Sequence, residues 1–313
     1  MATTRQAKSA VAFIGIGLLI YAGIWLAAER LMDRNGHSNP FFKIATSQVR
    51  AFDWVILGAS HAMPLDFANF NGVMQRETGL KIINLASPGT GPLYNRFVLE
   101  EYLRRHRARN VLYVADAFTF YSRAWNEDRF ADPKLIRRTP YEPAVAARMW
   151  RYAREEGVDP RAVLDYVSGF SKVNNRERLK PDVWEGEAQF ERVYRPSASV
   201  ADKRVAYLYP DGTPAAALER YMGELAGLVA AAQQAGARVV VVKMPLPAQF
   251  RQKLPDEDAF DAALARAMAA RGVAVRDFTA ALPEARFYFD SDHLNRAGQE
   301  AFFARDLAAL LAT

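Results

Sequence analysis

The sequence predicts an α/β protein with three layers, in which a five-stranded parallel sheet lies between helices and follows one membrane-spanning helix. Two observations support this prediction. From residue 51 to the C-terminus, short apolar runs rich in β-branched residues alternate with amphipathic stretches, which is the pattern of buried parallel strands joined by right-handed helical crossovers. Residues 9–28 carry no charge, and about twenty helical residues rise about 30 Å, the thickness of a bilayer's hydrocarbon core.

Composition limits the classes of function. The 313 residues are 50% hydrophobic, enough for a sizeable core, and none of them is cysteine, so neither a disulfide framework nor a thiolate metal site can form. The 41 basic residues exceed the 35 acidic ones and give a net charge of +6. This surplus suits an anionic membrane surface or polymer, but it is too small and too scattered to indicate nucleic acid as a partner.

The charges around the apolar stretch predict how it crosses the membrane. Arg5, Lys8 and the free amino group precede it, whereas the charges that follow it nearly cancel. By the positive-inside rule, residues 1–8 are cytoplasmic, residues 9–28 are the anchor, and the rest of the chain lies outside. We therefore expect a single-pass protein of a bacterial cytoplasmic membrane with a periplasmic or extracytoplasmic body. Residues 29–50 are mostly polar and are interpreted as a tether.

The sequence allows two other interpretations of residues 9–28. A buried core helix would carry a polar face, which this stretch lacks. A cleaved signal peptide would explain the small residues Ala27 and Ala28, but the apolar stretch exceeds the roughly 7–15 residues of a typical signal core. An uncleaved anchor is favoured, and cleavage stays open.

Five apolar runs are expected to form the sheet. The strands lie near 53–57 and at 80–85, 111–114, 239–244 and 273–278. Helical periodicity fills the connections between them. The expected helices cover residues 64–78, 93–109, 218–235, 260–270 and 296–311. Gly79 and Gly236 end the first and third of these helices, and Asn295 caps the last.

Residues 51–313 are interpreted as one domain interrupted by an insertion at about 122–210. This insertion is rich in aromatic residues and punctuated by prolines. We expect it to lie over the carboxyl edge of the sheet rather than to form a separate domain. Its tryptophans and tyrosines either stack against sugar rings or form the insertion's own small core, and the sequence leaves both open.

A candidate nucleophile stands where the first strand ends. The apolar run 55–57 stops at the Gly-Ala-Ser-His of residues 58–61. Glycine permits a sharp turn at the carboxyl end of a strand, where open α/β sheets bind their ligands. Ser60 would then present its hydroxyl and its backbone N–H to the crevice. Taken alone, this motif favours a serine that caps the following helix.

A second motif near the C-terminus supplies the partners that such a serine needs. Asp290-Ser291-Asp292-His293 stands just before the last helix and contains one of only four histidines. A serine becomes nucleophilic when a base takes its proton, and a carboxylate must hold that base in the right tautomer. The spacing lets Asp290 and His293 share one turn, with Asp292 as the competing orienter. Helix capping by either aspartate, or a metal site formed by these three residues, are the alternatives.

Gly-x-Ser after the first strand and Asp-x-x-His before the last helix together resemble the SGNH (GDSL-type) hydrolase superfamily. The resemblance implies a flavodoxin-like strand order and a catalytic triad of Ser60, His293 and Asp290 that works through an acyl-enzyme. It also implies two oxyanion-hole donors, the backbone N–H groups of Ser60 and of Gly89, which follows the second strand. The superfamily's third donor is an asparagine side chain after the third strand.

The chain departs from the superfamily at this third donor. Asp116 stands there, and a carboxylate repels an oxyanion unless it is protonated, so its place in the oxyanion hole stays open. If Asp116 lines that hole, Asp116→Asn should raise the hydrolysis of small esters. His61, next to Ser60, is interpreted as a wall of the pocket. Such departures also occur in membrane-anchored relatives, namely the teichoic-acid D-alanyl transfer protein and the accessory proteins of alginate and cellulose O-acetylation.

These features and the resemblance predict a membrane-anchored, SGNH-type serine acyltransferase or acylesterase. It would act on O-acetyl or O-D-alanyl groups of a cell-envelope polysaccharide or lipid-linked glycan. The expected partners are the membrane, the glycan and a membrane-bound O-acyltransferase that donates the acyl group, and no cofactor or metal is expected. The alternative is a non-catalytic glycan-binding or scaffolding subunit of an O-acylation complex, which Asp116 favours and the intact triad opposes. The sequence does not distinguish transfer from hydrolysis.

Overall fold

The computed structural model describes residues 2–35, 38–136, 139–174 and 184–313. The chain divides into two compact units. The helical unit contains Met1–Phe42 and Ala131–Asp182, and the sheet unit contains Lys43–Phe130 and Val183–Thr313. The predicted insertion at 122–210 is therefore shared, because its middle belongs to the helical unit and its two ends belong to the sheet unit.

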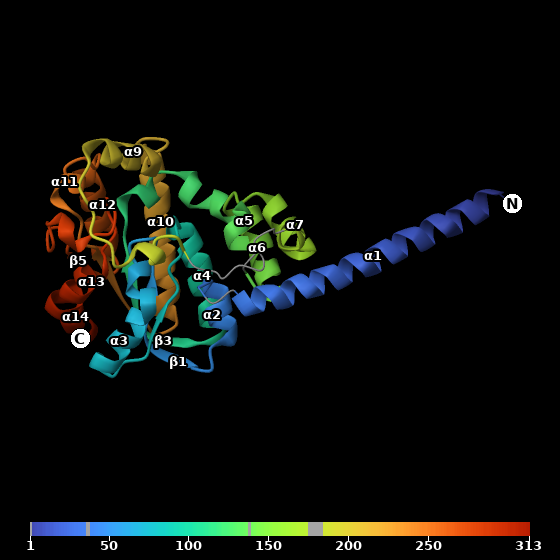
Figure 1. Ribbon diagram of the computed structural model, residues 1–313, viewed down its shortest axis with the longest axis horizontal. Coiled ribbons are helices and arrows are strands. Elements are labelled where there is room, and N and C mark those ends of the chain that lie inside the picture. Colours follow the sequence, from blue (N-terminus) through green and yellow to red (C-terminus); the bar gives the residue numbers. More distant parts are fainter. Residues whose placement is uncertain (1, 36–37, 137–138, 175–183) are drawn as a thin grey trace. The chain divides into compact units, whose positions relative to one another are not determined.

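The centre of the sheet unit is a five-stranded parallel sheet with the order β2-β1-β3-β4-β5 (Figure 1). The strands are β1 (Ala51–Leu57), β2 (Ile82–Asn84), β3 (Arg107–Val114), β4 (Arg238–Lys243) and β5 (Ala274–Asp277). The expected parallel α/β fold is confirmed, and its 2-1-3-4-5 order is the flavodoxin-like one. The register places Val55 of β1 between Ile83 of β2 and Val111 of β3, so the carboxyl ends of these strands share one edge.

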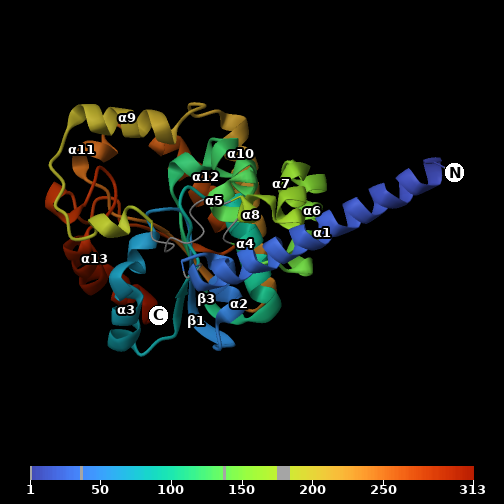
Figure 2. The same cartoon turned by 45° about the vertical axis from the view of Figure 1, so that its right-hand side comes forward.

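Helices cover both faces of this sheet (Figures 1 and 2). The helices on one face are α4 (Pro92–Arg105), α10 (Ala215–Gln234) and α12 (Glu257–Ala269). Those on the other are α3 (Phe70–Thr78), α13 (Arg296–Phe302), a π-helical turn (Phe303–Leu307) and α14 (Ala308–Leu311). Because side chains alternate along a strand, Trp54 and Ile56 of β1 enter the core beneath α3 and α13, whereas Val55 and Leu57 are buried toward the opposite face.

Two boundaries differ from those expected, each for a local reason. Strand β3 begins at Arg107, inside the stretch expected to be helical, because Arg107 pairs with Ala51 at the start of β1. The helix expected from residue 64 begins as an α-helix only at Phe70. Ala68 and Asn69 just before it have positive φ, which a continuous right-handed helix does not permit.

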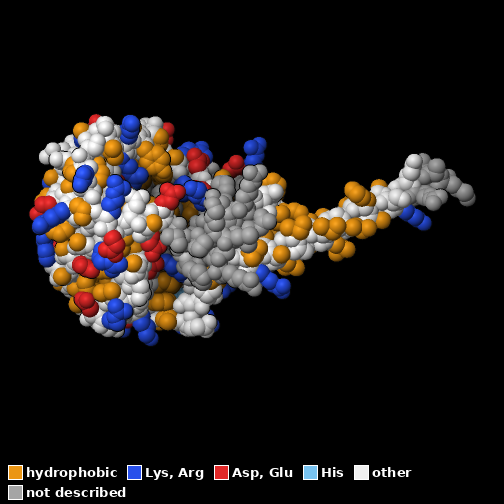
Figure 3. Space-filling model, viewed as in Figure 1, with side chains coloured by type: hydrophobic (Ala, Val, Ile, Leu, Met, Phe, Trp, Pro, Cys, Tyr) orange, Lys and Arg blue, Asp and Glu red, His pale blue; other side chains and the backbone are white. Residues whose placement is uncertain are grey.

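The helical unit begins with α1 (Ala2–Asn35). Within α1, Gln6–Met32 has a mean hydropathy of 2.2 and is long and apolar enough to cross a membrane. Figure 3 shows hydrophobic side chains along this helix, and most large apolar side chains between Val11 and Leu26 are exposed. The predicted span 9–28 lies inside α1, and its exposure does not fit a buried core helix.

The segment predicted to be a tether, 29–50, contains more helix than expected. Helix α1 continues to Asn35, and α2 (Pro40–Thr46) follows after a short connection. The Asn39 side chain accepts hydrogen bonds from the backbone N–H groups of Phe41 (2.9 Å) and Phe42 (3.3 Å), and so starts α2 in the way of an N-cap.

Further helices complete the two units. In the helical unit they are α5 (Pro133–Ile136), α6 (Pro143–Glu155), α7 (Pro160–Ser168) and α8 (Phe170–Val173). In the sheet unit they are α9 (Ala198–Leu208), α11 (Ala248–Arg251) and short turns of 3-10 helix, among them η1 (Met63–Leu65) and η3 (Ala117–Phe120).

Candidate active site

Gly58 forms the turn that ends β1 and begins the site. Its φ is +146°, and a Cβ there would lie 2.8 Å from the Val114 Cβ, so only glycine fits without strain. Its N–H donates to Asn95 Oδ1 (3.0 Å), and its carbonyl accepts from the Thr90 hydroxyl (3.2 Å). These contacts fix the backbone that carries Ser60, which is 5% exposed at the carboxyl end of β1.

The Asp290 side chain forms hydrogen bonds that shape the loop carrying His293. Its Oδ1 accepts hydrogen bonds from the backbone N–H groups of Asp292 (3.0 Å) and His293 (2.8 Å), which closes a tight turn. The same carboxylate lies 2.9 and 3.0 Å from His293 Nδ1. Burial alone raises the pKa of Asp290, but the charge of His293 and its hydrogen bond lower that pKa below its ordinary value. The three-residue spacing therefore produces an ionised carboxylate on Nδ1.

The ring of His293 is enclosed by aromatic side chains. Phe289 stacks on it with a centroid separation of 5.4 Å, and Trp184 meets it edge-on at 5.3 Å. The other ring nitrogen, Nε2, is buried and makes no hydrogen bond with any described residue. An imidazole whose Nδ1 is held by a carboxylate and whose Nε2 is unengaged is oriented to act as a base through Nε2.

Ser60 and His293 lie at the same edge of the sheet. The ring of His61, the chain neighbour of Ser60, lies 4.8 Å from the ring of His293, centroid to centroid. Within the part of the chain that the structure describes, neither the hydroxyl nor the backbone N–H of Ser60 makes a hydrogen bond. The predicted nucleophile and one predicted oxyanion donor are thus without a hydrogen-bond partner among the described residues.

Gly89 supplies the second predicted donor. Its φ is +60°, and a Cβ would lie 2.8 Å from the Trp125 ring. The preceding carbonyl, that of Pro88, accepts a hydrogen bond from Arg129 Nη2 (3.0 Å), which holds the loop. The Gly89 N–H donates to no other described residue. Glycine is required here because Trp125 covers it.

Asp116, the open position in the predicted oxyanion hole, is paired with His61. Its Oδ1 lies 2.6 Å from His61 Nδ1, and both side chains are buried. Burial lowers the pKa of His61, but Asp116 and then Asp292 outweigh it and raise that pKa to about 10. His61 is therefore an imidazolium at neutral pH. Asp116 Oδ1 accepts a hydrogen bond from His61, and His61 is more than the pocket wall that the sequence suggested.

Asp292 continues this pairing on the other side of His61. Its Oδ2 lies 3.2 Å from His61 Nε2 and accepts from Arg204 Nη2 (2.8 Å) and Nε (3.0 Å). Burial raises the pKa of Asp292, but His293, Arg204 and His61 together hold it well below its ordinary value. Two carboxylates and two cations thus alternate in the order Asp116, His61, Asp292, Arg204, which we call the charge network.

Asp292 is engaged in this network and is not the orienter of the base. Its nearer oxygen lies 3.7 Å from His293 Nδ1, compared with 2.9 Å for Asp290. Its Oδ1 instead accepts from the Ser291 hydroxyl at 2.7 Å. Of the two aspartates that the sequence offered as partners of His293, Asp290 is therefore the one close enough to hold its Nδ1.

One group of residues has the composition of a metal site. His61, Asp292 and His293 are buried, and each offers a ligand atom within 4.8 Å of the others. This differs from the sequence-based alternative, in which Asp290 took the place of His61. A divalent cation here would face the Arg204 guanidinium on the same carboxylate and would have to displace the proton from His61. The residues therefore fit an ion-pair network better than a metal.

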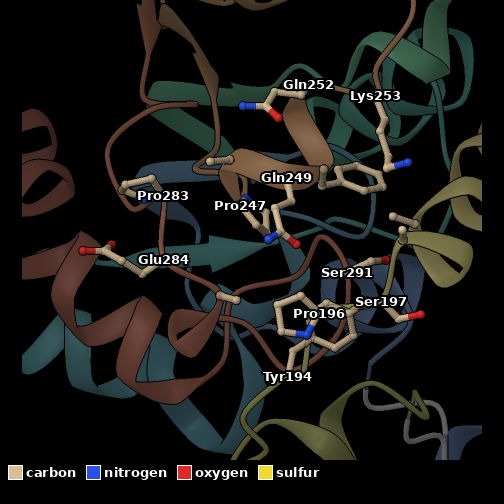
Figure 4. Close-up of a pocket in the computed structure, with 15 residues that line it drawn as sticks. Tyr194, Pro196, Ser197, Pro247, Gln249, Gln252, Lys253, Pro283, Glu284 and Ser291 are labelled. Carbon is tan, nitrogen blue, oxygen red and sulfur yellow. The ribbon is translucent and has the colours of Figure 1, made fainter.

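A cavity of about 710 Å³ opens beside the Asp290–His293 loop (Figure 4). Ser291 lines it, and the labelled side chains of Tyr194 and Gln249 surround it together with prolines 196, 247 and 283. Its volume suits a small ligand or a segment of a polymer. The cavity and the charge network share a wall, because the Ser291 hydroxyl donates to Asp292.

Sequence reasoning paired Asp290 with His293 but missed the charge network. Arg204 lies in the predicted insertion, 88 residues from Asp292, and nothing in its neighbourhood marks it. His61 and Asp116 were both noted, but their pairing across 55 residues has no local signal. The one available hint was that a buried carboxylate at the end of β3 requires a positive partner.

Comparison with known proteins gives structural matches alone. No protein-family model matches the chain, and no curated protein matches it. A Bacteroides fragilis structure provisionally assigned as an acylhydrolase aligns with a TM-score of 0.42 and 9% identity, covering 87% of this chain and 95% of that one. A Streptococcus pneumoniae structure provisionally assigned as a platelet activating factor aligns with a TM-score of 0.38 and 12% identity, covering 97% and 99%. Because both TM-scores lie below 0.5, we base the fold and the site on this chain's own sheet order and geometry.

Proposed function

We propose that this protein is a membrane-anchored serine acyltransferase or acylesterase of the SGNH type, acting on O-acyl groups of a cell-envelope glycan. The observation that carries the proposal is how the two ring nitrogens of His293 are engaged. Its Nδ1 is held by Asp290, its Nε2 is buried and unengaged, and Ser60 stands at the same edge of the sheet. A nucleophilic serine requires a base that a carboxylate orients and that comes within reach of the serine hydroxyl; the first requirement is met by Asp290 and His293.

The reaction follows from these roles. Ser60 Oγ attacks the acyl carbonyl carbon while His293 Nε2 takes its proton, and Asp290 stabilises the resulting imidazolium. The N–H groups of Ser60 and Gly89 receive the oxyanion, where one donor is worth about 2.7–4 kcal/mol. The leaving alcohol takes the proton from His293 as the acyl–Ser60 ester forms. A second alcohol or water then gives its proton to His293, attacks the ester and restores Ser60.

Transfer rather than hydrolysis is supported by the anchor. Gln6–Met32 is long and apolar enough to cross a membrane, and the charge bias of the sequence favours a body outside the cytoplasm. An anchored site stays close to a membrane-embedded acyl donor, which we propose to be a membrane-bound O-acyltransferase. The cavity beside Ser291 is proposed to hold the glycan next to the acyl–Ser60 ester.

A second candidate is a non-catalytic glycan-binding subunit. One observation favours it: the carboxylate of Asp116 replaces a neutral donor and is committed to His61. In that case, Ser60 would be dispensable for function in the cell, whereas the cavity would not.

A fluorophosphonate probe separates the two candidates. The purified full-length protein should be labelled, Ser60→Ala should abolish the label, and His293→Ala should slow labelling by about 10²–10⁴-fold. Ser87→Ala is the matched control, because Ser87 is also buried beside this turn and its N–H donates to the Gly58 carbonyl. Labelling that survives Ser60→Ala, or full complementation of a deletion strain by Ser60→Ala, would contradict the enzyme proposal.

A further inference from the structure

The corner between α7 and α8 exposes three large apolar side chains. Leu164, Val167 and Phe170 are 65%, 47% and 61% exposed. The buried side of α7 carries Val163 and Tyr166, and Leu164 and Val167 lie beside it, so the apolar side of α7 is wider than its buried part, whereas Arg161, Asp165 and Ser168 form the polar side. A surface helix in water normally carries polar residues on its outer face, and contiguous exposed apolar side chains indicate an interaction site.

Two charged side chains lie within residues 162–173, and each is engaged with another group, whereas Arg161 is exposed at the start of α7. Asp165 accepts a hydrogen bond from the backbone N–H of Ser171 (2.8 Å). Lys172 is 1% exposed, pairs with Glu29 of α1 and lies 5.3 Å from the centre of the Tyr166 ring. The pairing of Lys172 with Glu29 lowers the cost of placing these two charges in a medium of low dielectric constant.

The corner is aligned with α1, which belongs to the same unit. Its contacts follow α1 turn by turn. The Ser168 carbonyl accepts from the Tyr21 hydroxyl (3.0 Å), Gly169 lies against the Trp25 indole, and the Lys172–Glu29 pair comes one turn later. Figures 1 and 2 both show α6 and α7 beside the C-terminal half of α1.

Gly169 makes this alignment possible. Its φ is +66°, and a Cβ there would collide with the Trp25 indole, so glycine both turns the chain between α7 and α8 and permits the close approach. Trp25 is also in edge-on contact with Tyr141, with centroids 5.2 Å apart. The depth of the corner along α1 is therefore set by packed contacts.

That depth places the corner inside the predicted bilayer. Tyr21 precedes Ala28, the end of the predicted span, by seven residues, which corresponds to about 10 Å along a helix. Ser168 is bonded to Tyr21, and it therefore lies about 10 Å below the outer boundary of a span that ends at Ala28. Amphipathic elements that lie in a membrane interface bury their apolar face about 5–10 Å deep.

We propose that the corner formed by α7 and α8 inserts Leu164, Val167 and Phe170 into the outer leaflet of the bilayer that α1 spans. The helical unit is then held at two places, by the spanning helix and by an element lying in the interface. This proposal rests on the membrane anchoring in the proposed function and is independent of the chemistry at Ser60.

The absence of cysteine from the chain allows a direct test with single-cysteine variants of the full-length protein. Leu164→Cys, Val167→Cys and Phe170→Cys are labelled with the fluorophore NBD and reconstituted in vesicles of phosphatidylethanolamine and phosphatidylglycerol that contain nitroxide-labelled lipids. Glu155→Cys, exposed at the end of α6, is the matched control. Quenching at the three corner positions should exceed that of the control by about threefold or more, as expected for residues in the interface.

Leu19→Cys in α1 reports whether the anchor is inserted. If position 19 is quenched and the corner positions match Glu155→Cys, the corner does not enter the leaflet and the proposal is wrong, although the anchor stands. If position 19 is not quenched, both the anchor and the corner insertion are wrong. In addition, Phe170→Asp should reduce quenching of a label at position 164 by about half or more, since a carboxylate resists insertion. Ser60-dependent fluorophosphonate labelling of the same samples reports separately on the catalytic proposal.

Discussion

His61 Nδ1 lies 2.6 Å from Asp116 Oδ1, and each side chain is 6% exposed. This pairing gives the buried carboxylate of Asp116 a partner of opposite charge. The carboxylate is compensated by an imidazolium, and that imidazolium is compensated on its other side by Asp292. The pocket edge therefore keeps an alternating set of charges instead of a third hydrogen-bond donor.

The pairing changes the expectation for Asp116→Asn. From the sequence, this substitution should restore a donor and raise ester hydrolysis. In the structure, it removes the partner of a buried cation, which typically costs about 3–5 kcal/mol of stability. We therefore expect lower thermal stability and lower activity for Asp116→Asn and for His61→Gln, and a double variant less destabilised than the sum, with a coupling of about 0.5–3 kcal/mol.

These single and double variants form a double-mutant cycle. Its control is the exposed Arg154–Glu155 pair, whose N···O distance is 3.5 Å. Arg154→Gln and Glu155→Gln should show a coupling of about 1 kcal/mol or less. Additive effects of the His61 and Asp116 substitutions would show that the two residues do not form the pair described.

The raised pKa of His61 predicts a pH-dependent stability. Its pKa is about 10 in the folded protein and 6.5 without the fold, because Asp116 and Asp292 outweigh the effect of burial. The stabilisation is therefore fully present below pH 6.5 and is lost as the pH rises through about 10. The wild type should lose stability relative to His61→Gln over this interval, by up to about 1.4 kcal/mol per pH unit. Parallel stability–pH curves for the two proteins would contradict an imidazolium at position 61.

Much of the fold could be predicted because its signals are local. Short β-branched runs alternating with amphipathic stretches define a parallel sheet, and the five predicted strands are the five observed. Asn295 was expected to cap the last helix, and its side chain accepts from the Gly298 N–H (2.9 Å). The pairing of Asp290 with His293 is also local, because it is made within one turn of the chain.

The remainder depends on contacts between distant segments. His61 and Asp292 are 231 residues apart, and no periodicity or spacing connects them. Arg204 belongs to a stretch that was expected to form part of an insertion, and its partner is known only once the fold brings α9 to the Asp290–His293 loop. The grouping of residues 131–182 with the N-terminal helix is likewise a tertiary property without a sequence signal.

Asp290→Asn should distinguish two roles of Asp290, the orientation of the His293 ring and the formation of the turn. An amide oxygen can still accept the N–H groups of Asp292 and His293, so thermal stability should change little. However, the amide cannot stabilise an imidazolium at Nδ1, and fluorophosphonate labelling should slow by about 10²–10⁴-fold. Labelling at the wild-type rate would mean that Asp290 only shapes the loop.

The cavity beside Ser291 should control substrate binding. Gln249 is exposed at its rim, so Gln249→Trp should narrow the cavity without disturbing the core. We expect about a tenfold higher KM for an acylated glycan with kcat within about twofold, the pattern of lost uniform binding. Gln234→Trp, at the exposed end of α10, is the control. Unchanged KM in Gln249→Trp would place the substrate elsewhere.

Gly58 and Gly79 provide a matched test of whether the turn after β1 positions the nucleophile. Both have positive φ, +146° and +71°, but a Cβ at Gly79 meets nothing within 4 Å, whereas at Gly58 it would lie 2.8 Å from the Val114 Cβ. Gly79→Ala should therefore cost about 1–2 kcal/mol of stability from backbone strain alone and leave Ser60 labelling intact. Gly58→Ala should cost more and should slow labelling by at least about 10²-fold, since a displacement of about 1 Å at a reacting group has that effect. Equal stability losses and equal labelling in the two variants would show that the turn at Gly58 does not hold Ser60 in place.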